Sequence, residues 1–316
     1  MSGAENDVAA DDLSKLARGL QQFSGPGYAA VDGAQWTNLP GTLADVGLSG
    51  RSLFLGAGSQ VELAGPWLVC LEPPAEKAEA VLSLVGEKPA AVFWRCGAGE
   101  AALWRHMRTL NQIEMPRTEQ TAGDGDAEQN APSGMEIVFF RHWDPRSLGA
   151  ILPLLDEAQF ARVLGPADEV LFCDPRSLGG LGTRRAVRTP QLTALPHGRL
   201  RLTAAQVEAL GATMQERSRR RICHYLRQAA PEQVGTLAEA ELDATVASSV
   251  KEAHDMGVSG EVSVGLWAYM RATSANDLSR ETMVHRFMAD PRQGVSPDAR
   301  MQSLFDLRSR ALQDHG

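Results

Sequence analysis

Residues 138–148 read V-F-F-R-H-W-D-P-R-S-L, an apolar run that leads into charged and aromatic side chains and a proline. Asp-Pro is typical of a chain that leaves a strand and enters a helix, because proline fixes φ and aspartate can cap the backbone. Residues two apart on a strand share a face, so we expect Arg141 and Trp143 on one side and His142 and Asp144 on the other. The stretch therefore predicts either a structural corner or an active site with His142 and Asp144 as acid and base.

Short apolar runs and helical patterns alternate around this corner. The sequence predicts strands at 28–31, 52–55, 66–71, 91–95, 135–140 and 169–173, and helices at 75–84, 99–110, 148–155 and 157–164. Later helices are predicted at 203–225, 242–253, 262–270, 278–288 and from Ser296 onward. Alternation of this kind indicates an α/β fold. We therefore expect an N-terminal lobe with a mixed sheet flanked by helices, followed by an all-helical C-terminal lobe.

Composition divides the chain further. Residues 1–25 are polar and rich in Gly and Ala, which predicts a flexible leader with one short helix around 13–20, and 26–175 are predicted to form the α/β lobe. Within that lobe, 116–134 has no large apolar side chain and is predicted to be a mobile loop, because it cannot bury enough surface to offset its ordering entropy. Residues 176–201 are predicted to link the lobes, and 202–316 to form the helical lobe.

Bulk properties narrow the class of protein. The 316 residues are 43% hydrophobic and 22% charged, with a formal net charge of -8, which argues against general nucleic-acid binding. The first 20 residues carry acids where a signal peptide carries bases, and no apolar run approaches the roughly 18 residues that span a membrane. Four scattered cysteines suit free thiols in a reducing compartment. We expect a cytoplasmic protein with no membrane partner.

Motifs for catalysis and for ligands are missing. The seven histidines, at 106, 142, 197, 224, 254, 285 and 315, have no metal-ligand spacing and no nearby cysteine partner. Residues 55–61 begin like a dinucleotide loop, but Val61 stands where the third glycine is needed. No phosphate loop and no nucleophile elbow occurs. We expect no metal, no cofactor and no enzyme, although an active site assembled from distant residues around His142 and Asp144 stays open.

A basic helix lies in the second half. Its arginines are Arg217, Arg219, Arg220, Arg221 and Arg227. They indicate a solvated helix face, a docking stripe for an acidic partner or, less readily, a nucleic-acid contact.

The ordered landmarks of the first lobe resemble a known family. They are Y-A-A-V-D-G at 28–33, R-S-L-F at 51–54, G-P-W-L-V at 65–69, F-W-R-C at 93–96, L-W-R-H-M-R at 103–108 and F-F-R-H-W-D-P-R-S-L at 139–148. Their order and rough spacing resemble the type VI secretion effector chaperones, also called Tap or TEC adaptors. The family's hallmark is a strand ending in Arg, two mostly aromatic positions and Asp-Pro, which here gives Arg141, Trp143, Asp144 and Pro145 as the structural motif. His142 stands where the family usually has an aromatic ring.

The resemblance implies a non-enzymatic cytoplasmic adaptor. Such a protein binds a specific effector and helps to load it onto the secretion spike, which is VgrG with or without a PAAR tip. The resemblance and the basic helix together give these candidate partner-binding residues: Asp32, Trp67, Trp94, His142, Arg217, Arg220 and Arg221. The alternatives are the enzyme considered above and a nucleic-acid-binding regulator.

Overall fold

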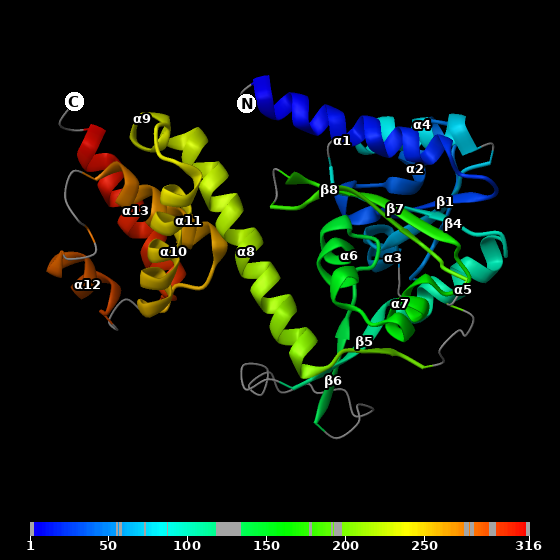
Figure 1. Ribbon diagram of the computed structural model, residues 1–316. Coiled ribbons are helices and arrows are strands. Elements are labelled where there is room, and N and C mark those ends of the chain that lie inside the picture. Colours follow the sequence, from blue (N-terminus) through cyan, green and yellow to red (C-terminus); the bar gives the residue numbers. More distant parts are fainter. Residues whose placement is uncertain are drawn as a thin grey trace. The chain divides into compact units, whose positions relative to one another are not determined.

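A computed structural model divides the chain into two units (Figure 1). It describes residues 3–313 except 55, 57–58, 73, 87, 118–133, 177–178, 191, 193–197, 275–277, 279–280 and 291–294. The α/β unit comprises residues 2–176 and 180–214, and the helical unit comprises 215–316 with 177–179. The division falls inside helix α8 (Ala204–Ala229), whereas the sequence suggested a boundary at its start. The predicted mobile loop at 116–134 lies mostly outside the described residues.

A six-stranded sheet forms the centre of the α/β unit. Its order is β2-β3-β1-β4-β7-β8, and every neighbouring pair is antiparallel. The strands are β1 (Gly27–Asp32), β2 (Gly50–Ser52), β3 (Pro66–Cys70), β4 (Ala91–Arg95), β7 (Glu169–Asp174) and β8 (Gly182–Val187). Strand β8 lies in the stretch expected to be a linker. Its sequence, G-T-R-R-A-V, contains two arginines and lacks the apolar run by which the other strands were predicted, so the sequence did not indicate that it pairs with β7.

Helices cover both faces of this sheet. They are α1 (Gly3–Gln21), α2 (Leu39–Asp45), α4 (Pro74–Val85), α5 (Glu100–Leu110), α6 (Pro145–Ile151) and α7 (Glu157–Leu164), with α3 (Ser59–Ala64) and the 3₁₀ turns η1 (Gly33–Gln35) and η2 (Leu152–Leu154) between them. Along β1, Ala29 and Val31 pack in the core formed with α1, α2 and α4, whereas Tyr28 and Ala30 pack in the core formed with α5, α6 and α7. Burial of both faces explains why the predicted strands show no polar alternation.

Helix α1 is longer than the short helix predicted within the leader, and it packs on the sheet. Leu16 and Leu20, four residues apart, are buried in the same core as Leu171 of β7. The carboxylate of Asp12 is buried as well and accepts a hydrogen bond from Arg176 Nε at 3.0 Å. The polar composition indicated only a short helix, because the apolar stripe that holds α1 on the sheet is narrow.

A second, three-stranded sheet lies in the same unit. Strand β5 (Gln112–Pro116) pairs antiparallel with β6 (Met135–Phe139) and parallel with β9 (Leu200–Arg201). Only β6 was predicted from the sequence. This sheet brings the opening motif, which follows β6, beside the end of α5.

The helical unit has a core of its own. Its helices are the C-terminal part of α8, α9 (Pro231–Val234), α10 (Glu239–Asp255), α11 (Glu261–Thr273), α12 (Thr282–Met288) and α13 (Pro297–Gln313). Trp267 is fully buried at its centre, and its Nε1 donates a hydrogen bond to Glu252 at 3.3 Å. The predicted fold class is confirmed. No helix within the described ranges is long and apolar enough to cross a membrane.

Candidate functional site

One buried carboxylate organises the corner that follows β6. Asp32 ends β1, caps η1 and is 2% exposed. Arg141 Nη2 donates to its Oδ2 at 2.7 Å, and Trp143 Nε1 donates to its Oδ1 at 3.2 Å. Arg141 and Trp143 therefore reach the same group, although they lie in a turn rather than on the strand itself. This network ties the second sheet to the end of the first.

His142 and Asp144 are directed to different partners. The His142 ring is fully buried with its Nε2 3.1 Å from Asn111 Oδ1, and burial lowers its pKa to about 3. Asp144 is the N-cap of helix α6. It accepts hydrogen bonds from the backbone N of Arg146 at 2.9 Å and from the guanidinium of Arg146. No hydrogen bond within the described residues joins His142 to Asp144, and each side chain is held by a partner of its own.

Three aromatic rings continue the corner toward the surface. Phe54, Phe139 and Trp143 have ring centroids 5.5 Å apart in every pair, with edge-to-face geometry. Trp143 is 2% exposed, whereas Phe139 is 56% exposed. The tryptophan that binds Asp32 thus supports an aromatic side chain that faces solvent.

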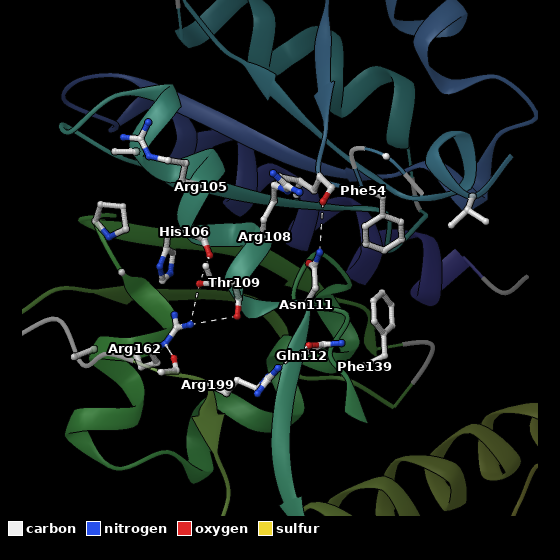
Figure 2. A pocket seen from close by; sticks show the side chains of 18 residues that line it. Phe54, Arg105, His106, Arg108, Thr109, Asn111, Gln112, Phe139, Arg162 and Arg199 are labelled. Atoms are coloured by element: carbon white, nitrogen blue, oxygen red, sulfur yellow. Dashed lines mark hydrogen bonds between the residues drawn. The ribbon is translucent and has the colours of Figure 1, made fainter. Parts of the chain in front are cut away.

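Phe54 and Phe139 line one end of an open hollow of about 1320 Å³ (Figure 2). The hollow lies between α5, the start of β5 and α7, and its lining includes four arginines and no acidic residue among the described positions. Arg105, His106 and Arg162 lie at the end away from the two phenylalanines (Figure 2). The hollow therefore combines an apolar end with a basic one.

Among the described residues, no carboxylate forms an ion pair with the arginines of the basic end. Arg162 is 7% exposed, and its Nε donates to Gly198 O at 2.6 Å while Nη2 donates to Thr109 Oγ1 at 2.8 Å. Burial lowers the pKa of Arg162. Arg105 and Arg108 are exposed on α5, and no ion pair within the described residues joins either of them or Arg162 to an acid. Their charges therefore face the hollow uncompensated.

Two further groups of the lining carry less charge. Burial lowers the pKa of His106 to about 4, so its ring is neutral at pH 7 with Nε2 3.0 Å from Val163 O. Arg199 lies 3.8 Å from Glu114, which also pairs with Arg201. The free positive charge of the hollow thus comes from Arg105, Arg108 and Arg162.

Comparison with family models gives one result. Residues 27–162 match DUF4123, a domain of unknown function. This family is associated with effector adaptors of type VI secretion. The DUF4123 match begins at β1 and ends within α7, so it includes Asp32, the corner and both phenylalanines of the hollow. Searches among curated proteins and among solved structures gave no match.

The predicted partner-binding residues fall into two groups. Four of them have side chains that are buried in this structure and do not reach the surface: Asp32, Trp94, His142 and Arg217. The first three of these lie in the DUF4123 match. The other three are at least partly exposed: Trp67, Arg220 and Arg221. For these three, partner binding stays a prediction.

The two accessible arginines of helix α8 already have acidic neighbours. Arg220 Nε is 3.0 Å from Glu216, and Arg221 forms an ion pair with Glu261. Their charges are therefore partly compensated, unlike those of the hollow.

The hollow itself was not predicted from the sequence. Arg105 and Arg108 lie three residues apart on α5 and share a helix face, which is the one signal that could have indicated it. Its other parts come from distant segments. The described part of the chain holds no cluster of three or more His, Cys, Asp or Glu side chains arranged to bind a metal ion.

Proposed function

We propose that this chain is a non-enzymatic adaptor that binds a specific type VI secretion effector in the bacterial cytoplasm and helps to load it onto the VgrG or PAAR spike. The match of residues 27–162 to DUF4123 is the observation that carries the proposal. It fits the resemblance in the sequence, whose hallmark is the Arg141 to Pro145 motif.

The geometry of that motif supports a scaffold role. A general acid or base must reach a substrate, yet His142 is enclosed and stays neutral at pH 7. Asp144 is committed to the N-terminus of α6, and Asp32 to Arg141 and Trp143. The two carboxylates accept hydrogen bonds from their own donors, which is what buried polar groups need in order to hold a fold, whereas Nδ1 of the buried His142 ring has no hydrogen-bond partner among the described residues.

An adaptor works by covering apolar surface of the protein that it binds. An effector that waits for secretion exposes apolar segments, and burying them against a partner removes them from water and from aggregation. The α/β unit offers the exposed ring of Phe139 beside a hollow for such a contact.

Co-expression tests the proposal. The full chain with an affinity tag is produced together with the effector encoded beside its gene, and each protein is also produced alone. We expect the effector to co-elute with the chain through size-exclusion chromatography and to give several-fold more soluble protein than when produced alone. Separate elution together with an unchanged soluble yield of the effector would overturn the proposal.

A further inference from the structure

Within the α/β unit, three of the four arginines of the hollow lack an ion-pair partner among the described residues, whereas the fourth, Arg199, lies 3.8 Å from Glu114. Several arginines there lie within ion-pair distance of a carboxylate, namely Arg95, Arg141, Arg146, Arg176, Arg185 and Arg201. Arg105, Arg108 and Arg162 have no such partner in the described residues, although the whole chain carries a net charge of -8. Positive charge that the fold leaves uncompensated in an acidic protein is complementary to an acidic ligand.

Two of these cations are held in place before any ligand arrives. Arg162 is fixed by Gly198 O and by Thr109, and burying a cation without a carboxylate costs folding free energy. The Arg108 guanidinium lies 4.6 Å from the ring centroid of Trp104, and the Arg51 guanidinium lies 3.5 Å from the same centroid. Such preorganised cations lose little entropy when they bind an anion.

The apolar end narrows the class of ligand. Phe139 is 56% exposed beside Phe54, and both line the same hollow as the arginines (Figure 2). Small-molecule sites are usually roughly 300–1000 Å³ and enclosed. The hollow is larger and open, and it suits a stretch of polypeptide that places one large apolar side chain on the rings and carboxylates on the guanidinium groups.

We propose that this hollow binds an acidic segment of a partner polypeptide. Carboxylates of that segment pair with the exposed Arg105 and Arg108, beside the buried charge of Arg162, and a large apolar side chain packs against Phe54 and Phe139. The inference rests on the proposed function for one point only, that the segment belongs to the effector.

A peptide-binding assay on the full chain tests the ligand class. The probe is the fluorescein-labelled peptide EEELFEEE, with KKKLFKKK and EEEGSEEE as comparators, measured by fluorescence anisotropy. We expect EEELFEEE to bind at least tenfold more tightly than either comparator. Raising the salt from 0.05 M to 0.5 M should weaken this binding at least fivefold, because screening acts on exposed charges.

A double variant locates the binding. Arg105→Glu with Arg108→Glu reverses two exposed charges and should weaken EEELFEEE at least tenfold without lowering the melting temperature. The control is Lys15→Glu with Arg18→Glu, which makes the same charge change at the same spacing on α1, the helix on the opposite face of the sheet. A second variant, Phe139→Ser, should weaken EEELFEEE but leave EEEGSEEE unchanged.

Four results would overturn the inference. The first is equal binding of the acidic and basic peptides, and the second is equal loss in the α1 control. The third is tighter, hollow-dependent binding of a 20-nucleotide poly(dT), or competition by millimolar phosphate, which would assign the hollow to nucleic acid or to a small anion. The fourth is peptide binding that arises only after the acids of segment 116–134, namely Glu119, Asp124, Asp126 and Glu128, are changed to amides, which would assign the hollow to this chain itself.

A final arm separates this inference from the proposed function. If the Arg105→Glu and Arg108→Glu variant still co-purifies with the effector at the wild-type yield, the hollow is not the effector's site and the inference fails, while the adaptor function stands. If the wild-type chain binds EEELFEEE through these arginines but not the effector, the ligand class is supported and the adaptor function fails.

Discussion

At the scale of single residues, Asp32 has two donors from one turn of chain. Arg141 and Trp143 approach different oxygens of its carboxylate, at 2.7 and 3.2 Å, and both come from a segment 109 or more residues away in sequence. Trp143 also supports the exposed ring of Phe139. A substitution of Asp32 is therefore expected to disturb the packing of both the corner and the apolar end of the hollow.

Asp32→Ala should destabilise the α/β unit by about 2–3 kcal/mol. The change leaves the buried indole N–H of Trp143 without an acceptor and removes the partner of Arg141, whose side chain is 39% exposed and recovers part of the loss in water. Urea denaturation measures the effect. The control is Asp45→Ala, at an exposed position, and a cost as small as that of the control would contradict the described network.

Two buried histidines make stability depend on pH. Burial lowers the pKa of His106 to about 4 and of His142 to about 3, both from 6.5 in the unfolded chain. Below about pH 6.5 the unfolded state binds protons that the folded state excludes, so stability is lost as the pH falls from 6.5 toward these values. Each histidine contributes a slope of up to about 1.4 kcal/mol per pH unit.

His142→Asn should remove about half of that slope. Urea denaturation at several values between pH 6 and pH 4.5 measures it, and His254→Asn, at an exposed position, is the control. A slope in the His142 variant that equals the wild-type slope would show that the ring is not buried and neutral in the folded chain.

At the scale of elements, the sequence predicted those strands and helices that carry an apolar pattern of their own. Strand β4 and helix α5 lie within a residue of their predicted bounds, because a buried strand and an amphipathic helix carry local signals. Strand β9 has only two residues and is a strand because it pairs with β5. Strand β8 has a basic sequence and pairs with β7. Pairing of this kind is decided by tertiary contacts, which no local pattern reports.

Helix α6 offers a test of capping at the Asp-Pro step. Asp144→Ala should cost about 1–2 kcal/mol, because it removes the acceptor for the backbone N of Arg146. Asp144→Ser keeps a capping oxygen and loses the ion pair with Arg146, so it should recover most of the stability. Thermal unfolding of the two variants measures the difference, and an equal loss in both would mean that the ion pair, rather than the cap, stabilises the helix.

At the scale of the whole molecule, the candidate site could be predicted only in part. The motif from Arg141 to Pro145 was evident in the sequence, and its polar residues do lie in one corner. The hollow was not, because it assembles Phe54, Arg105, Phe139 and Arg162 from segments that only the fold brings together. Burial could not be read from residue type either, since the interior contains Asp32, whose carboxylate is bound by Arg141 and Trp143, and the His142 ring, whose Nε2 lies 3.1 Å from Asn111 Oδ1.

The two units should respond separately to core damage. Trp267→Ala leaves a large void in the helical unit and should cost that unit about 3–5 kcal/mol. Hydrogen exchange followed by mass spectrometry should then show faster exchange in α10 and α11 and an unchanged rate in β1 and β4, which belong to the α/β unit. Faster exchange throughout the chain would contradict the division into two units.

We propose that this chain holds an effector rather than transforming a substrate. The most direct measurement is the half-life of that effector in growing cells, after protein synthesis is stopped, with and without the gene for this chain. We predict a half-life several-fold shorter in the deletion strain and restored by the wild-type gene, together with loss of the effector from the secreted fraction. An unchanged half-life and unchanged secretion would contradict the account.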